Sequence, residues 1–309
     1  MRKDLSIYAP ILPALILYSF LAHHLNFTQD DAYISFRYVA NFLNGHGLVY
    51  NIGERIEGIT NFGWTIYLTA AGAIGLDYIG IAKMTGFLCG MAFIFVTYIT
   101  ARRLFTGRLQ WFALVPVYLI AANQSVAYWS PAGLETTAFS FWVALSVYLF
   151  LIRSRYLASA LLLTVWVRPE GALVAGLLVI IEFANERRFP RYSLYHTLLA
   201  LILLVPWLAF KLGFYGSIVP NPFFAKTGVS LDQLSGGLSY ALEFFKDYGF
   251  LGLGWLVPLV MYKKLSSEMR SVQRVARSWA SEKISSRDKY WILRKSSSPW
   301  RRGISSSSW

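Results

Sequence analysis

Long apolar segments separated by short charged or turn-rich loops run from the start of the chain to about residue 262. Segments of this kind are typical of helices that cross a lipid bilayer. The segments that we interpret as spans are 6–25, 81–101, 110–128, 137–152, 156–167, 171–184, 194–212 and 247–262. The pattern predicts an all-α polytopic membrane protein, a helical bundle with about eight transmembrane helices.

The loops between these segments differ in charge, which predicts their sides of the membrane. Basic clusters follow several spans: Arg102-Arg103 with Arg108, Arg153 with Arg155, Arg187-Arg188 with Arg191, and Lys263-Lys264. Because basic loops stay in the cytoplasm, the loops 26–80, 129–136, 168–170 and 213–246 are expected outside. The basic start Met1-Arg2-Lys3 lies inside, before an uncleaved first helix, since the apolar run is long for a signal peptide and no cleavage site follows. We expect a multi-pass protein of the cytoplasmic (inner) membrane.

This topology requires that the hydrophobic stretch 62–76 does not cross the membrane. It has about 15 residues, which is short for a span, and it fits a helix at the outer interface. The alternative is that 62–76 does cross and that one basic loop faces out. The shortness of the stretch favours the interfacial interpretation.

Composition narrows the possible classes of protein. Hydrophobic residues make up 56% of the chain and charged residues 15%, and the mean hydropathy is +0.45, so an ordinary soluble domain is excluded. A single cysteine excludes a disulfide framework, and the four histidines form no cluster that would bind zinc. Of the net charge of +13, +9 belongs to residues 263–309, so charge does not favour a nucleic-acid partner.

The tail 263–309 is basic, rich in serine and tryptophan, and without apolar periodicity, which predicts disorder. One interpretation is a cytoplasmic extension that binds anionic lipid. The other is out-of-frame or truncated coding sequence, which the tryptophans favour slightly because they are rare in natural disordered tails. Residues 1–262 form the predicted transmembrane domain.

The first outer loop, 26–80, opens with an acidic pair, Asp30-Asp31, directly before a helical pattern. On that helix a polar line and an apolar face are expected, and Gly45-His46-Gly47 ends it. The polar line is Tyr33, Arg37, Asn41 and Asn44, and the apolar face is Ile34, Tyr38, Val39, Phe42 and Leu43. The loop is therefore expected to hold an amphipathic helix at the membrane surface.

The two aspartates can serve different purposes because adjacent residues on a helix diverge by about 100°. One can accept the proton of an incoming hydroxyl, while the other orients groups or binds a divalent cation such as Mg²⁺ or Mn²⁺. Their place at a helix N-terminus favours the ionised form. The alternative is a helix-capping aspartate with a solvated neighbour.

Two further features carry polar groups on the side predicted to be outer. The segment 48–64 holds Glu54, Arg55, Glu57 and Asn61 among aromatic residues, a combination suited to sugar and phosphate. The short spans 156–167 and 171–184 meet at Arg168-Pro169-Glu170-Gly171, which can lie below the outer surface in a protein-lined cavity. Charges there are either a functional site or a structural ion pair.

These residues resemble a known family. The stretch Asp-Asp-Ala-Tyr-Ile-Ser-Phe-Arg-Tyr, followed by the segment 45–61, is similar to the outer-loop signature of a branch of the GT-C glycosyltransferases. That branch includes terminal β-arabinofuranosyltransferases and proteins described as flagellar motor control proteins. Shorter matches are Gly133-Leu134-Glu135-Thr136, the turn 168–171 and the segment 220–226. The resemblance covers about residues 1–262.

The resemblance implies a GT-C-like bundle that transfers a sugar, possibly arabinofuranose-like, from a polyprenyl-phosphate donor to a glycan, lipid or protein acceptor at the outer (periplasmic) face. It assigns activation of the acceptor hydroxyl to Asp30, with help from Asp31, which is also the candidate cation ligand. Candidates for the donor phosphate are Arg168, Lys226 and Arg55, because such a reaction needs positive charge at the leaving group. Glu135 is a candidate for sugar hydroxyls or, alternatively, complements a helix dipole. The remaining candidates for substrate binding are Arg37, Glu54, Glu57, Asn61, Glu170 and Asn221.

Two other functions remain open from the sequence. A transporter or flippase of lipid-linked sugars would need paths from both faces, whereas the charged candidates cluster on one. A truncated, inactive membrane protein or an assembly factor is the other alternative.

Overall fold

The computed structural model describes residues 8–226, 234–243, 245 and 246. The expected span 247–262 and the tail 263–309 lie outside the described residues. Within them the chain is helical and contains no strand, as the sequence predicts. The elements are η1 (Ala9–Ile11), α2 (Leu12–His24), α3 (Ala32–Leu43), α4 (Phe62–Ala73), α5 (Tyr78–Leu104), η2 (Gly107–Ala113), α6 (Leu114–Ala121), α7 (Gln124–Trp129), α8 (Thr136–Leu151), α9 (Leu157–Val167), α10 (Gly171–Glu186), α11 (Arg191–Tyr215) and α12 (Asn221–Lys226).

Two of the described helices, α5 and α11, are long and apolar enough to cross a bilayer. Their 27 and 25 residues give lengths of about 40 Å, more than the hydrocarbon core of roughly 30 Å. Only 28% and 17% of their most apolar windows are buried, so most of this apolar surface is free to face lipid. The other predicted spans up to residue 212 coincide with shorter helices, and the number of about eight spans is not confirmed.

The predicted span 110–128 is divided among η2, α6 and α7. The break between α6 and α7 has a local cause. The Asn123 side chain accepts hydrogen bonds from the backbone N–H groups of Ser125 and Val126. This cap starts a new helix within the apolar run.

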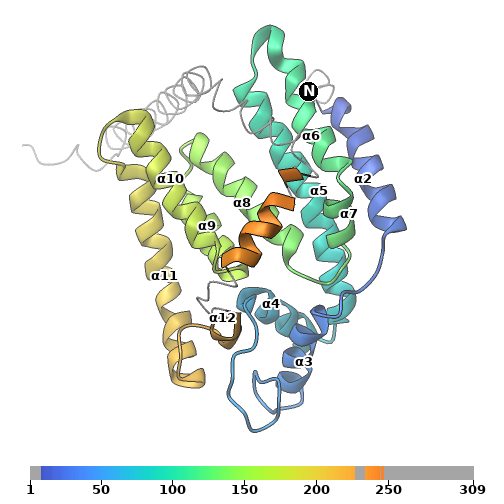
Figure 1. Ribbon diagram of the computed structural model, residues 1–309, viewed down its shortest axis with the longest axis vertical. Helices are drawn as coiled ribbons and strands as arrows, with labels where there is room; N and C mark the ends of the chain where they lie inside the picture. Colours follow the sequence, from blue (N-terminus) through green and yellow to red (C-terminus); the bar gives the residue numbers. More distant parts are fainter. Residues whose placement is uncertain (1–7, 227–233, 244, 247–309) are drawn as a thin grey trace, which may run out of the picture.

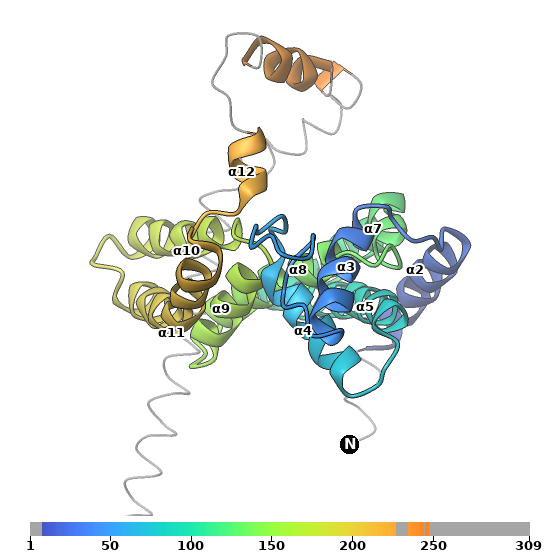
Figure 2. The same cartoon turned by 90° about the horizontal axis from the view of Figure 1, so that it is seen from below.

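The helices run between two ends of different composition (Figure 1). The connections after α5, α8 and α10, which carry the basic clusters, lie at the end where the chain starts, whereas α3, α4 and α12 lie at the opposite end. Viewed from that opposite end, α3 and α4 lie between α9–α11 on one side and α2, α5 and α7 on the other (Figure 2). The loops fall into the two groups that the charge pattern requires. Which group faces the cytoplasm stays a prediction.

Helix α4 differs from the surface helix expected over 62–76. Its 12 residues span about 18 Å, which is too short to cross a bilayer, but most of them are buried against α3, α5 and α9. The reason is that the helix is apolar around its circumference and so has no polar face to turn to water. Gly63 allows the contact with α9, since a Cβ there would lie 2.6 Å from the Trp166 carbonyl oxygen.

Helix α3 forms and ends where the pattern predicts, with Gly45 and Gly47 at positive φ. Its buried face is rotated from the predicted one: Ala32, Ser35 and Phe36 are buried beside Tyr38 and Val39, while Phe42 and Leu43 are exposed. The rotation follows from Ser35, which forms a hydrogen bond inside the protein and draws its side of the helix inward.

We expect Gly63→Ala to lower the free energy of unfolding by about 1–3 kcal/mol, because the new methyl group must displace backbone where α4 meets α9. The control is Gly176→Ala in α10, where a Cβ meets nothing within 4 Å. Alanine should be neutral or slightly stabilising there. Unfolding of the purified protein in detergent micelles measures both, and equal stabilities of the two variants would contradict the packing described.

Candidate active site

The acidic pair lies at the start of α3 and is tied to the loop before α8. The Gln29 N–H donates to the Ala132 carbonyl oxygen at 3.0 Å, and Gly133, at φ +87°, lies against Ala32 and Phe36. Both Asp30 and Asp31 are exposed. One oxygen of Asp30 accepts hydrogen bonds from Gln29 Nε2 at 2.7 Å and from the Asp31 N–H at 2.9 Å. The other carboxylate oxygen of Asp30 is available to a bound hydroxyl.

One turn along α3, a buried polar network begins. Ser35 Oγ donates to Asn61 Oδ1 at 3.2 Å, and Asn61 Nδ2 donates to Glu135 Oε2 at 2.7 Å. All three side chains are buried. Glu135 is the N-cap residue of α8, so its charge complements the helix dipole, and its carboxylate contacts Asn61 without forming a capping bond. The network joins α3, the start of α4 and the start of α8.

Arg168 extends this network to the turn between α9 and α10. Its guanidinium lies 3.5 Å from Glu135 Oε1 and 3.1 Å from Glu170 Oε1. Burial lowers the pKa of Arg168, but the hydrogen bond to Glu170 and the charges of Glu135 and Glu170 outweigh burial and raise it overall. Burial likewise raises the pKa of Glu170, but Arg168 lowers it by more, so it lies below its usual range. The three groups together carry one negative charge, so Arg168 is already neutralised by the protein.

Glu57 forms an ion pair with a residue that was not predicted from the sequence. Lys211, inside the apolar helix α11, places its Nζ 2.8 Å from Glu57 Oε2, and both side chains are 3% exposed. Burial raises the pKa of the Glu57 carboxyl, and the ammonium of Lys211 opposes that rise. The Glu57 carbonyl oxygen accepts from the Asn221 N–H at 2.9 Å, so the loop, α11 and α12 are fastened together.

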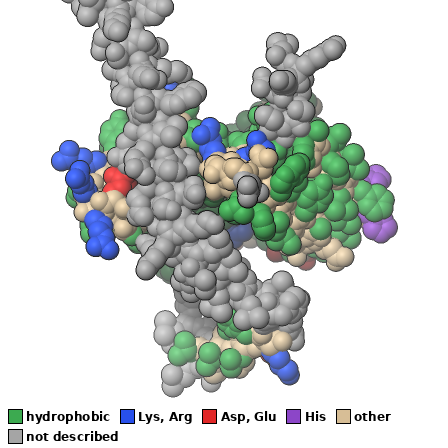
Figure 3. All heavy atoms as spheres, turned by 90° about the horizontal axis from the view of Figure 1, so that it is seen from above, with side chains coloured by type: hydrophobic (Ala, Val, Ile, Leu, Met, Phe, Trp, Pro, Cys, Tyr) green, Lys and Arg blue, Asp and Glu red, His purple; other side chains and the backbone are tan. Residues whose placement is uncertain are grey.

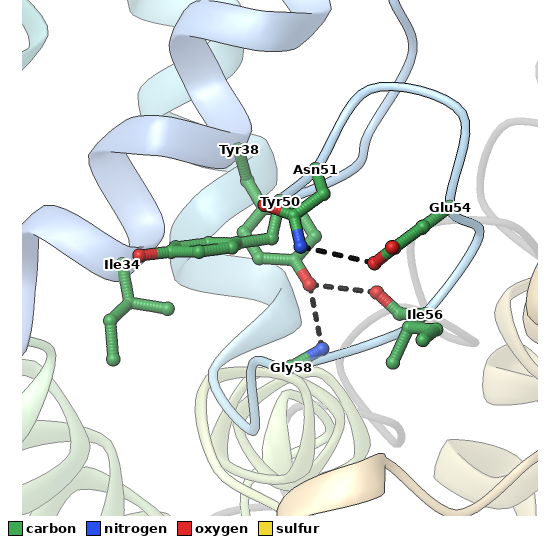
Figure 4. A pocket seen from close by; sticks show the side chains of 7 residues that line it. All are labelled: Ile34, Tyr38, Tyr50, Asn51, Glu54, Ile56 and Gly58. Atoms are coloured by element: carbon green, nitrogen blue, oxygen red, sulfur yellow. Dashed lines mark hydrogen bonds between the residues drawn. The ribbon is translucent and has the colours of Figure 1, made fainter.

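The first loop also encloses a pocket of about 270 Å³ (Figure 4). The Tyr38 hydroxyl accepts from the Gly58 N–H and donates to the Ile56 carbonyl oxygen, both at 2.7 Å, which holds one wall. Beside these bonds, Glu54 accepts a hydrogen bond from Asn51 at 3.0 Å (Figure 4). The Tyr50 ring extends away from these bonds toward Ile34, and Arg37 lies over that ring and donates to the Tyr50 carbonyl oxygen at 2.8 Å. Ile34, one turn from Asp30, lines the same pocket.

An apolar groove of about 380 Å³ adjoins the network, between α4, α9 and α11. It is lined by Phe62, Ile66, Leu162, Trp166, Leu203, Leu204, Pro206, Trp207 and Phe210. Three of these residues lie within two positions of a polar site residue in the sequence. Phe62 follows Asn61, and Phe210 precedes Lys211. Trp166 lies two positions before Arg168. The indole N–H groups of Trp166 and Trp207 have no acceptor among the described residues. The groove therefore ends near the polar network.

Arg55 lies over Phe214, one helical turn of α11 beyond the groove residue Phe210. Its guanidinium carbon is 5.1 Å from the centre of the Phe214 ring, which stacks on Phe210 at 5.3 Å. Unlike Arg168, Arg55 forms no ion pair with a described residue. Lys83, also missed by the sequence reasoning, lies near the acidic pair, with its Nζ 3.2 Å from Thr28 Oγ1.

Three expectations remain untested by this arrangement. Asn221 begins α12, and its side chain is exposed; the side chain of Lys226, at the end of α12, lies outside the described part. Within the described residues no group of three or more His, Cys, Asp or Glu side chains converges, so a cation at Asp31 would need most of its ligands from the substrate.

Comparison with known proteins tests the resemblance that the sequence predicts. The chain is 27% identical over 297 residues to a terminal beta-(1->2)-arabinofuranosyltransferase of Mycobacterium tuberculosis, covering 87% of this chain and 45% of that protein. It is 28% identical over 278 residues to the protein of the same name from Corynebacterium glutamicum, covering 74% of this chain and 37% of that protein. The predicted resemblance is confirmed. The chain thus spans less than half the length of these curated relatives. No family model and no solved structure matches it.

These arabinofuranosyltransferase relatives support a glycosyltransferase function. The sequence identified the acidic pair, Asn61, Glu135, Arg168 and Glu170, and the last four form one connected group in the structure.

We expect Lys211→Met to lower the free energy of unfolding by about 3–5 kcal/mol, because it leaves the Glu57 carboxylate buried without its partner. The double variant Glu57→Gln/Lys211→Met should regain most of that loss. Lys83→Met is the matched control, since Lys83 contacts only a neutral hydroxyl among the described residues, and about 1 kcal/mol is expected there. Denaturant unfolding in micelles measures the three variants and the wild type. A double variant no more stable than Lys211→Met would contradict the buried pair.

Proposed function

We propose that the chain is a GT-C-type membrane glycosyltransferase that takes a sugar from a polyprenyl-phosphate donor at the outer face of the inner membrane. The acceptor is a glycan, lipid or protein hydroxyl. The observation that carries the proposal is the meeting of the acidic pair, the buried polar network and an apolar groove at one end of the bundle. Relatives named for arabinofuranosyl transfer support a furanose as the sugar.

The groove between α4, α9 and α11 suits the prenyl tail of the donor. Its lining is almost wholly apolar and aromatic, and one of its walls belongs to α11, whose apolar surface is largely exposed. An isoprenoid chain could enter from the lipid without crossing water, and burial of its apolar surface would supply binding energy. The unpaired indole N–H groups of Trp166 and Trp207 are suited to the phosphate end of such a ligand.

The donor phosphate needs a cation that the protein has not already neutralised. Arg55 meets this requirement, because it holds its guanidinium over Phe214, one turn of α11 beyond the groove, with no described carboxylate partner. Arg168 has a different role here: it fixes the buried Glu135 and the exposed Glu170, whose carboxylate can accept hydrogen bonds from sugar hydroxyls. This division assigns positive charge to the leaving group and negative charge to the sugar.

The transfer step then follows from the acidic pair. The acceptor oxygen attacks the anomeric carbon, the bond from that carbon to the phosphate oxygen breaks, and polyprenyl phosphate leaves. Asp30 takes the proton of the acceptor hydroxyl through its available oxygen. The aromatic pocket around Tyr50 lies one turn away and is of a size to hold part of a sugar acceptor.

We expect Asp30→Asn to lower transfer of a labelled sugar from a polyprenyl-phosphate donor by about 10²–10⁴-fold, the usual contribution of a general base. The control is Asp77→Asn, because Asp77 caps α5 through two backbone N–H groups and asparagine caps about as well. Both variants should insert and unfold like the wild type. Transfer by Asp30→Asn at the wild-type rate would contradict the assigned base.

We expect Leu203→Trp to raise the donor KM roughly tenfold with little change in kcat, since it fills a groove that holds only the non-reacting tail. Leu201→Trp is matched to it: the two leucines are 49% and 48% exposed on the same helix, and Leu201 does not line the groove. Steady-state kinetics with the donor varied distinguishes them. Equal KM values for the two variants would contradict binding of the prenyl tail in this groove. They would not bear on the role of the acidic pair.

A further inference from the structure

A second cavity, of about 560 Å³, lies at the opposite end of the bundle from the candidate active site. It is formed where the connection after α8 meets the end of α10 and the start of α11. In the view onto this end, Lys and Arg side chains gather beside an acidic group over the α10–α11 side (Figure 3). The proposed transfer reaction uses none of these residues.

The floor of the cavity is a fixed set of paired charges. Glu182, which is buried, accepts from Arg153 at 2.9 Å and from the Ser193 N–H at 2.7 Å. Arg153 also pairs with Glu186. Tyr192 donates to the carbonyl oxygen of Ser154 at 2.9 Å and lies under the Arg153 guanidinium. The floor therefore holds α8, α10 and α11 in place and needs no ligand.

The rim has a different character. Arg188 and Arg191 both line the cavity, are exposed, and form no ion pair with a described residue. Arg191 is also the first residue of the 25-residue helix α11, whose positive dipole end adds to the potential there. The cavity thus carries an excess of positive charge with backbone and guanidinium donors for an anion.

The apolar surroundings of the rim indicate which anion. Tyr195 lines the cavity and begins an exposed stripe along α11 with Leu198 and Ile202, while Ile180 and Phe183 are exposed on α10. A free phosphate would gain nothing from these surfaces, whereas the acyl chains of a lipid would cover them. Basic cavities between helices at a membrane surface bind anionic headgroups.

We propose that this cavity is a binding site for the headgroup of an anionic phospholipid, with the phosphodiester between Arg188 and Arg191 and the acyl chains along α10 and α11. The site is separate from sugar transfer, so it stands whether or not the proposed function is correct.

Native mass spectrometry of the full chain, released from detergent with added lipid, tests this proposal. Phosphatidylglycerol should bind the wild type in preference to phosphatidylcholine, and Arg188→Gln/Arg191→Gln should weaken its binding roughly 30-fold. The control Arg102→Gln/Arg103→Gln removes the same charge at the same end of the molecule, where the two side chains lie over Tyr98 and Tyr148. That control should bind phosphatidylglycerol like the wild type.

Three results would each overturn the site. The first is equal binding of the two lipids by the wild type, and the second is an equal loss in both double variants, which would indicate general attraction. The third is displacement of phosphatidylglycerol by an equal concentration of inorganic phosphate, which would make the acyl chains irrelevant. Thermal unfolding of both variants within a degree or two of the wild type excludes misfolding as a cause.

Discussion

The hydrogen bond between Asn61 and Glu135 holds the candidate site together. A buried carboxylate is expensive unless it is paired and hydrogen-bonded, and Glu135 meets that requirement only through Asn61 from the first loop and Arg168 from the α9–α10 turn. Ser35 joins the same group from α3. Segments that are 26 to 133 residues apart in sequence are therefore fixed to one another around the Glu135 carboxylate. The acidic pair at the start of α3 is positioned as a consequence, since Ser35 lies one turn from Asp31.

The polar network lies beside apolar helices and an apolar groove, and this combination suits a ligand with a polar and an apolar part. Lys211 would be out of place in an apolar helix of membrane-spanning length, yet the structure pairs it with Glu57 and keeps both from water and lipid. This pair secures the loop over the groove between α4, α9 and α11. The result is a charged, hydrogen-bonding region next to an apolar groove. A lipid-linked sugar has the complementary parts, a polar sugar phosphate joined to an apolar chain.

The sequence was a good guide to the features that depend on local pattern. The apolar runs marked the helices up to residue 212, and Gly45 and Gly47 marked the end of α3. The charge of the loops grouped them correctly at two ends. Helix α4, within the predicted stretch 62–76, is mostly buried against other helices, which periodicity could not show, because it reports that a helix is apolar but not whether lipid or protein covers it. Its place at the membrane interface stays a prediction.

The missed residues depend on tertiary contacts. Lys211 is separated from Glu57 by 154 positions, so no spacing rule connects them, and a lone lysine in an apolar run gives no partner. Lys83 lies within the second predicted span and is brought to Thr28 only by the packing of α5. Arg168 joins the buried polar network, but its two carboxylate partners could not be counted from the sequence, and they neutralise its charge.

The most direct test of the account is to locate a bound donor. A polyprenyl-phosphate sugar with a diazirine on the isoprenoid unit nearest the phosphate can be irradiated with the purified chain, and the labelled peptides can be identified by mass spectrometry. The account predicts labels on the groove walls at 62–66, 162–166 and 203–210. Labels confined to α2 and α6, or to the basic end of the bundle, would contradict it.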